Sequence, residues 1–212
     1  MKVIPFYLYS LINSIHLYSL YVENTPLKRY SKPLLIPSLM LFYYLSSSKV
    51  SKTLFTALFF AFLGDTFLMY QKTFILGCFT FCLGNTLYAY LNYKKINKIN
   101  FPLLITSLSI FYSIYLFGMF PYVKSYLGEM IYLVFLYFIP LVFMNSFAFY
   151  NMCNNRDTKS ILLFIGTLCF MISDYILTIV WYVKPNYPMY LINEYVMVTY
   201  LSAQGLLTYG LA

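Results

Sequence analysis

Apolar residues along this chain fall into long runs that short polar segments interrupt. The runs cover residues 3–22, 33–47, 53–70, 73–93, 101–121, 130–150, 160–182 and 190–211. A helix needs about 20 apolar residues to cross a hydrocarbon core about 30 Å thick. The runs do not alternate as barrel strands do, and in lipid a backbone that does not close a barrel must satisfy its hydrogen bonds within each segment. The pattern predicts an all-α fold, a polytopic membrane bundle of eight transmembrane helices.

The polar segments between the runs are short and carry nearly all of the charge. Examples are VENTPLKRYSK after the first run, YKKINKIN after the fourth and NNRDTKS after the sixth, with several turn-forming residues among them. None is long enough to hold a second domain, so residues 1–212 are predicted to form a single transmembrane domain. The first run is long for a signal peptide and lacks a small-x-small cleavage site, so we expect it to remain a membrane helix.

Composition agrees with a membrane protein, since only 9% of the residues are charged, whereas a soluble domain has about 25%. The net charge of +8 comes from Lys and Arg scattered over loops at both faces. A scattered charge does not indicate a nucleic-acid partner, and anionic lipid headgroups are the expected counter-charge. Loops on the side of the termini hold slightly more Lys and Arg, which places both termini in the cytoplasm by the positive-inside rule.

Several common catalytic and cofactor sites are excluded by the residues present. His16 is the only histidine, so a catalytic zinc site with three histidines cannot form. The chain has no Gly-x-Ser-x-Gly elbow, P-loop or Gly-x-Gly-x-x-Gly fingerprint. We therefore expect no metal, no cofactor and no obligate protein partner. Cys153, expected in a loop, and three cysteines inside the runs do not indicate a disulfide.

Two acidic residues lie inside the apolar runs: Asp65 in AFLGDTFLMY and Asp174 in FMISDYILTI. A carboxylate at mid-membrane costs about 2.5 to 3.5 kcal/mol and by default indicates a functional site. The third and seventh helices cross in the same direction, and a rise of about 1.5 Å per residue puts the two carboxyls within about 3 Å in depth.

If the two aspartates share a cavity, desolvation and like-charge repulsion leave one protonated carboxyl beside one carboxylate. That pair is a general acid and a general base. The alternative is that each Asp binds a neighbouring polar group and fixes helix packing.

Further polar residues are candidates for substrate binding. Lys32 in SKPLLIPSL begins the second helix, where its ammonium group could hold a phosphate, although a snorkelling lysine is the alternative. Single tyrosines are hard to interpret in a chain with 25 of them, because packing or an interfacial belt explains most. The other candidates are Asn85, Tyr88, Tyr200 and Gln204.

Six segments in order resemble the YhhN-like family of membrane proteins, whose animal members are lysoplasmalogenases. They are KPLLIP (32–37), FLGDTFL (62–68), LGNTLY (83–88), LYFIPLVFM (136–144), GTLCFMISDYIL (166–177) and YLSAQGLL (200–207). The resemblance implies eight transmembrane helices and a lysophospholipid substrate taken from the bilayer. The implied reaction is hydrolysis of the vinyl ether bond of a lysoplasmalogen to a fatty aldehyde and glycerophosphoethanolamine or glycerophosphocholine. The family's catalytic aspartates map onto Asp65 and Asp174. The resemblance implies the endoplasmic reticulum membrane for a eukaryotic member and the inner (plasma) membrane for a bacterial one.

One position departs from the family pattern. Many members have a histidine in the fourth helix, in a pattern like AHLLY, whereas this chain reads GNTLY with Asn85 at that place. Asparagine donates and accepts hydrogen bonds but does not carry a proton at neutral pH. Asn85 can therefore orient a substrate, but it cannot replace a proton-carrying histidine.

Three other functions fit part of the pattern. A proton-coupled transporter of a lipid-like or small substrate also uses paired intramembrane carboxylates, but its expected broken helices are not evident. Intramembrane aspartyl proteases carry the motifs Gly-x-Gly-Asp and Pro-Ala-Leu. In this chain Phe62 occupies the position of the first glycine, and the sequence has no Pro-Ala-Leu. A purely structural membrane protein would need the aspartates for folding and not for an activity.

Overall fold

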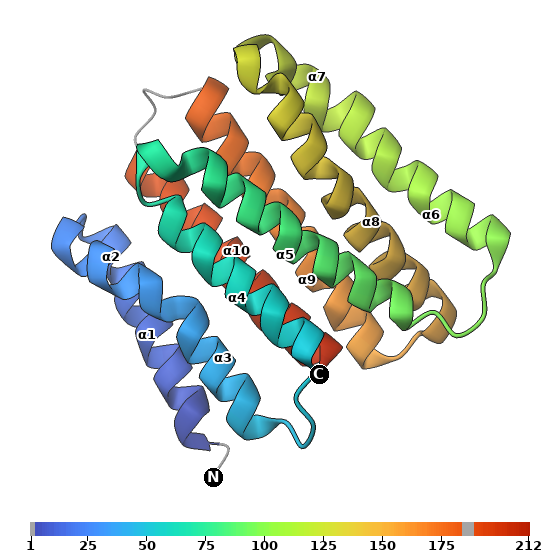
Figure 1. Cartoon of the computed structure of the whole chain (residues 1–212), viewed down its shortest axis with the longest axis horizontal. Helices are drawn as coiled ribbons and strands as arrows, with labels where there is room; N and C mark the ends of the chain where they lie inside the picture. The colour runs from blue at the N-terminus through green and yellow to red at the C-terminus, as the bar shows by residue number, and fades with distance from the viewer. Residues whose placement is uncertain (1–2, 184–188) are drawn as a thin grey trace. The chain divides into compact units, whose positions relative to one another are not determined.

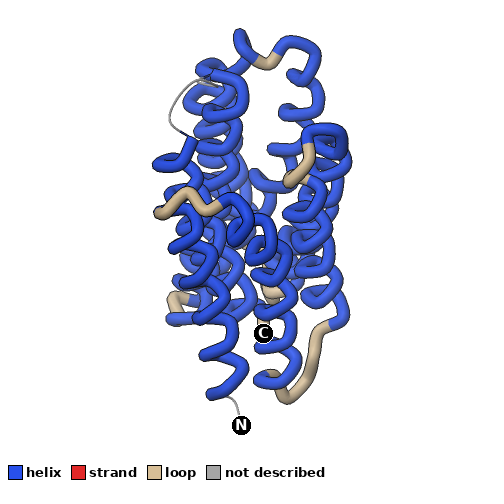
Figure 2. The backbone as a smooth tube through the Cα atoms, turned by 90° about the vertical axis from the view of Figure 1, so that its left-hand side faces the viewer, coloured by secondary structure: helices blue, strands red, loops and turns tan. Residues whose placement is uncertain are grey.

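The structure, a computed structural model, describes residues 3–183 and 189–212. These residues form helices joined by short connections, and no strand occurs among them (Figures 1 and 2). The predicted all-α fold is therefore confirmed, and helix occurs in each of the eight predicted runs. The chain divides into two compact units, residues up to Leu87 and Tyr88–Leu211, and helix α5 passes through the boundary. The prediction of a single domain stays a prediction.

The first unit is built from helices that follow one another as neighbours. α1 packs against α2 and α3, and α3 packs against α4. Its elements are α1 (Val3–Tyr21), α2 (Thr25–Ser31), η1 (Lys32–Leu34), α3 (Leu35–Ser46), α4 (Lys52–Phe67), η2 (Gln71–Thr73) and the first part of α5 (Phe74–Lys94).

Helix α2 lies where a loop was expected from the polar segment after the first run. The Asn24 side chain accepts a hydrogen bond from the backbone N–H of Leu27 at 2.9 Å and so caps the first turn. Pro26 stands in that same turn, where its missing N–H costs nothing. A good cap thus forms a helix that the hydrophobic pattern does not predict.

Glycines bring α4 and α5 together closely. A Cβ added to Gly64 would lie 2.5 Å from the Phe81 ring, and one added to Gly84 would lie 3.3 Å from the carbonyl oxygen of Ala57. Small residues at helix interfaces allow this close approach, as is common in membrane bundles. The contact fixes the part of α4 that carries Asp65 against α5.

The second unit is built around α8 and α9. α9 packs along α10, and α8 packs against both α6 and α9 (Figure 1). Its elements after α5 are α6 (Phe101–Ser113), the π-helix η3 (Ile114–Met119), α7 (Phe120–Val123), η4 (Lys124–Tyr126), η5 (Gly128–Met130), α8 (Ile131–Asn155), α9 (Thr158–Thr178), the π-helix η6 (Ile179–Val183) and α10 (Met189–Leu211).

Four helices among the described residues are long and apolar enough to cross a membrane: Gln71–Lys94, Phe101–Tyr126, Gly128–Asn155 and Thr158–Val183. The protein is therefore membrane-embedded. α4 has 16 residues and is about 24 Å long, which is less than a hydrocarbon core of about 30 Å. α1 is interrupted by polar residues such as Asn13 and His16. The count of eight spans stays a prediction.

Two helix ends differ from the hydrophobic pattern. α4 ends at Phe67, where a run to residue 70 was expected, because the Thr73 hydroxyl donates to the Phe67 carbonyl at 2.7 Å. α8 continues to Asn155, beyond the expected end at residue 150. Cys153 therefore lies in a helix, and its expected loop position is wrong. Backbone hydrogen bonds continue a helix regardless of whether its side chains are apolar.

Candidate active site

Asp174 lies in α9 with 8% of its surface exposed. The hydroxyl of Tyr137, from α8, donates a hydrogen bond to its Oδ2 at 2.6 Å. Pro140 stands inside α8 three residues later, and its ring nitrogen cannot donate to the carbonyl of Leu136. The π-helix η6 begins five residues after Asp174, a geometry that is frequent at functional sites. The carboxylate is thus buried beside a hydroxyl donor and irregular backbone.

Three of the predicted substrate-binding residues meet one turn from Asp174. Phe170 lies four residues before Asp174 on α9, and its ring centroid is 6.5 Å from that of Tyr88 and 5.7 Å from that of Tyr200. The Tyr88 hydroxyl donates to Oε1 of Gln204 at 2.7 Å. Both Tyr88 and Gln204 are fully buried, and Tyr200 is nearly so. The second unit therefore gathers Tyr88, Tyr200 and Gln204 around Phe170.

Asp65 lies in the last turn of α4 with 4% of its surface exposed. The residue before it, Gly64, contacts Phe81 of α5. Asn85 lies one turn beyond Phe81 on α5 and is fully buried. The first unit therefore carries a buried carboxyl and a buried amide on two helices that pack closely together.

Lys32 begins η1 and is half-buried. η1 contacts α4, and α4 runs antiparallel to α3, so the end of α4 and the start of η1 lie at the same end of the first unit (Figure 1). Asp65 is three residues before the C-cap Leu68, or about 4 to 5 Å along the axis. A group held by Lys32 would lie at that end of the unit.

Asp65 belongs to the first unit and Asp174 to the second. Because the two carboxyls lie in different units, their expected meeting stays a prediction. The geometry of each aspartate is nevertheless that of a buried ionisable group within a helix, which is costly unless it is used or paired.

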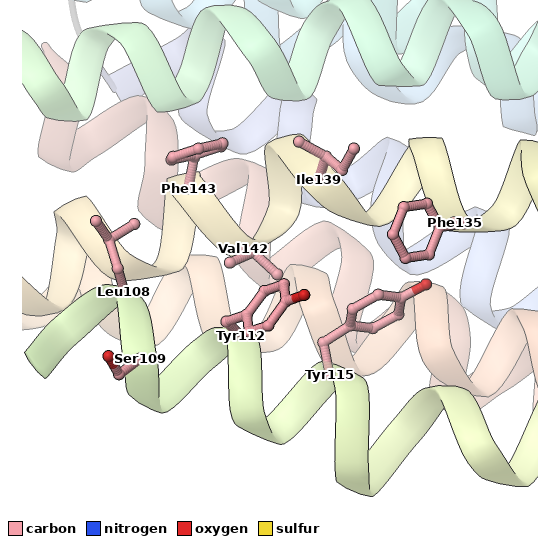
Figure 3. A pocket seen from close by; sticks show the side chains of 8 residues that line it. All are labelled: Leu108, Ser109, Tyr112, Tyr115, Phe135, Ile139, Val142 and Phe143. Carbon is pink, nitrogen blue, oxygen red and sulfur yellow. The ribbon is translucent and has the colours of Figure 1, made fainter. Parts of the chain in front are cut away.

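A cavity of about 340 Å³ lies in the second unit, between α6 with η3 and α8 (Figure 3). Its lining is almost wholly apolar or aromatic: Leu108, Ser109, Tyr112, Tyr115, Phe135, Ile139, Val142 and Phe143. It contains none of the predicted site residues. Tyr137 is two residues from both Phe135 and Ile139, so it projects from the opposite side of α8. The cavity is thus separate from Asp174.

The sequence did not predict Tyr137 as the partner of Asp174. The segment LYFIPLVFM contains this tyrosine, but nothing among 25 tyrosines distinguishes it. A proline three residues later, inside a membrane helix, is the one local signal that could have indicated this turn of α8.

The sequence model of the YhhN family matches residues 27–211. No curated protein and no solved structure matches the chain. The family match covers most of the chain, from α2 to the end of α10, and includes both buried aspartates. The chain therefore belongs to the YhhN family.

Proposed function

We propose that this protein is a membrane-embedded hydrolase that cleaves the vinyl ether bond of lysoplasmalogens. The observation that carries the proposal is the burial of two carboxyls, Asp65 and Asp174, within helices of a YhhN family member. Buried carboxyls in different surroundings can serve as a general acid and a general base. The products are a fatty aldehyde and glycerophosphoethanolamine or glycerophosphocholine.

The two carboxyls take different roles. The hydrogen bond from Tyr137 to Oδ2 of Asp174 stabilises negative charge on that carboxylate, which suits a base. Asp65 is 4% exposed and follows Gly64, which packs against the Phe81 ring of α5, and burial of this kind suits a protonated carboxyl. Asp65 is therefore the proton donor, and Asp174 activates water.

The reaction balances with water as the only co-reactant. Asp65 protonates the alkene carbon distal to the ether oxygen, and the double-bond electrons form the new C–H bond. The resulting oxocarbenium ion is stabilised by the carboxylate of Asp174, which then takes a proton from the attacking water. When the hemiacetal collapses to the aldehyde, Asp174 gives its proton to the glycerol oxygen, which leaves as the hydroxyl of glycerophosphoethanolamine or glycerophosphocholine. Asp65 takes the proton of the hemiacetal hydroxyl, so both carboxyls return to their starting states.

A single-chain lipid enters from the bilayer in this proposal. Its phosphate lies near Lys32, at the end of the first unit that also carries Asp65. Tyr88, Gln204, Tyr200 and Asn85 supply hydrogen-bonding groups and aromatic surface along the helices. The protein acts in the endoplasmic reticulum membrane if it is eukaryotic and in the inner membrane if it is bacterial.

The test is aldehyde release from a lysoplasmalogen by purified protein in detergent. We expect Asp65→Asn and Asp174→Asn each to lower the rate by about 10² to 10⁴, with the melting temperature unchanged. Asp157→Asn is the matched control, because the exposed Asp157 caps α9 and asparagine caps a helix equally well.

A folded wild-type protein that releases no aldehyde would contradict the proposal. Proton-coupled uptake into liposomes that depends on the same two aspartates would then support the transporter alternative.

A further inference from the structure

Two lysines and a histidine lie near one another at one end of the first unit. Lys28 and Lys32 are four residues apart, on the same face of α2 and η1, and both are half-buried. His16, on α1, is fully buried, and both lysines lie within electrostatic range of its ring. Arg29, beside Lys28 on α2, is exposed to the surroundings.

Hydrogen bonds determine which ring nitrogen of His16 carries the proton. Its Nδ1 lies 2.8 Å from Oγ of Ser31, and that hydroxyl donates its single proton to the carbonyl of Leu27 at 2.7 Å. Nδ1 must therefore be the donor to Ser31, and the neutral ring carries a lone pair at Nε2. Nε2 is buried and has no hydrogen-bond partner in the described part of the chain.

That lone pair suits a lysine ammonium group. An ammonium group has three N–H donors, so one can reach Nε2 while the other two remain for another acceptor. An anion that draws the lysine side chains toward the interior of the unit would bring one of their N–H donors to Nε2. The ring would then act as a positioning residue for them.

A bound anion would stabilise these two neighbouring, half-buried lysines. Burial lowers the pKa of Lys28 from its ordinary value, and the neighbouring charge of Lys32 lowers that pKa further. Like charges four residues apart on a helix destabilise it. An anion between the ammonium groups would relieve this repulsion and replace part of their lost hydration.

We infer that Lys28, Lys32 and the positioning residue His16 form a phosphate-binding site. The site takes a phosphate group, from either a lipid headgroup or a small phosphorylated molecule. Its link to catalysis rests on the proposed function: the site lies beside η1, which contacts α4, so a bound lysophospholipid would carry its glycerol toward the end of α4 where Asp65 lies.

Binding can be measured without hydrolysis. The probe is 1-O-alkylglycerophosphocholine, whose saturated ether has no alkene to protonate, and the reference is 1-O-alkylglycerol, which lacks the phosphate. The full-length protein in a non-ionic detergent is titrated with each amphiphile by isothermal calorimetry. Glycerol 3-phosphate and inorganic phosphate are added as competitors to identify the source of the phosphate group.

We expect Lys28→Gln and Lys32→Gln each to weaken binding of the phosphorylated probe about tenfold, as the loss of one charge-assisted hydrogen bond predicts. Binding of 1-O-alkylglycerol should stay unchanged. Lys28→Arg retains the charge and should restore most of the affinity. Arg29→Gln removes the same charge from an exposed position of α2 and is the matched control, with an expected change of less than about twofold.

The positioning role of His16 is tested by comparing two variants, one that keeps its hydrogen-bonding groups and one that does not. His16→Gln keeps an acceptor for the lysines and a donor for Ser31, whereas His16→Leu keeps neither. We expect His16→Gln to bind the phosphorylated probe more tightly than His16→Leu does, at equal affinity for 1-O-alkylglycerol. Competition by glycerol 3-phosphate would indicate a soluble phosphate ligand, and its absence would indicate a lipid headgroup.

The inference is overturned if the wild type binds both amphiphiles equally, or if the lysine variants behave like Arg29→Gln. These results do not depend on the proposed reaction. Lysine-dependent binding without aldehyde release would contradict the hydrolase proposal alone, and aspartate-dependent aldehyde release with unchanged lysine variants would contradict this inference alone.

Discussion

At the scale of single residues, the Tyr137 hydroxyl donates a side-chain hydrogen bond to Asp174. The hydrogen bond is short, at 2.6 Å, and it joins α8 to α9 at a carboxylate that is only 8% exposed. In a low-dielectric interior such a bond both fixes the carboxylate and stabilises its charge. The proposed base therefore depends on a tyrosine from another helix.

We expect Tyr137→Phe to lower the rate of aldehyde release about tenfold to a hundredfold, because one donor to the charged carboxylate is lost. The ring stays, so its edge contact with Phe138 and the fold should stay as well. The measurement is kcat beside the melting temperature. Tyr132→Phe, at an exposed position of α8, is the control. An unchanged kcat for Tyr137→Phe would show that the hydroxyl is not needed by Asp174.

The sequence predicted some of these residues and not others, for a physical reason. Asp65 and Asp174 could be found because a carboxylate among apolar residues is costly and therefore conspicuous. Tyr137 could not be found in this way, because its ring is apolar and its hydroxyl is polar, so a tyrosine fits many positions of a membrane helix. His16 was not among the predicted site residues, because its side-chain partner Ser31 lies on α2, where a loop was expected.

At the scale of helices, close packing in the second unit depends on glycine. A Cβ added to Gly166 of α9 would lie 2.9 Å from Cβ of Leu206 and 3.2 Å from the backbone nitrogen of Leu207, both on α10. The Ser173 hydroxyl also donates to the carbonyl of Val196 at 3.0 Å. These contacts hold α9, and with it Asp174, directly against α10.

Gly166→Ala should lower the free energy of unfolding by about 1 to 3 kcal/mol, because backbone atoms of α10 cannot move aside as a flexible side chain can. Gly118→Ala is the control, since a Cβ there meets nothing within 4 Å, and it should be neutral or slightly stabilising. Reversible unfolding in mixed micelles measures both variants. Equal stabilities for the two variants would mean that the α9–α10 contact adjusts at no cost.

The hydrophobic pattern located the helices but not their ends. An apolar run indicates that lipid or protein covers its side chains, and the position of the run therefore predicts the approximate position of a helix. Helix ends are set by local hydrogen bonds instead, such as the Asn24 cap that begins α2 and the Thr73 hydroxyl that bonds beyond the last turn of α4. The sequence segment Asn-Thr-Pro contains the Asn24 cap, a signal for a helix start. Because the surrounding residues are polar, this segment was nevertheless expected to be a loop.

At the scale of the whole molecule, the two short helices α3 and α4 decide the topology. Four helices of the described chain are long and apolar enough to span, whereas α3 and α4 have 12 and 16 residues. A short helix can cross if the bilayer thins locally or flanking residues snorkel, at a modest cost. If this pair crosses, the predicted eight spans put both termini on the same face.

Cysteine labelling decides between the two topologies. In a variant without native cysteines, single cysteines replace the exposed residues Lys49, Lys72, Lys98 and Lys124 in turn. Eight spans predict that positions 49 and 98 react with a membrane-impermeant maleimide from the cytoplasmic face, and positions 72 and 124 from the other face. If α3 and α4 do not cross, position 49 will instead react from the same face as position 72. Labelling after permeabilisation provides the control that every cysteine is reactive, so a face-specific signal reports topology and not burial.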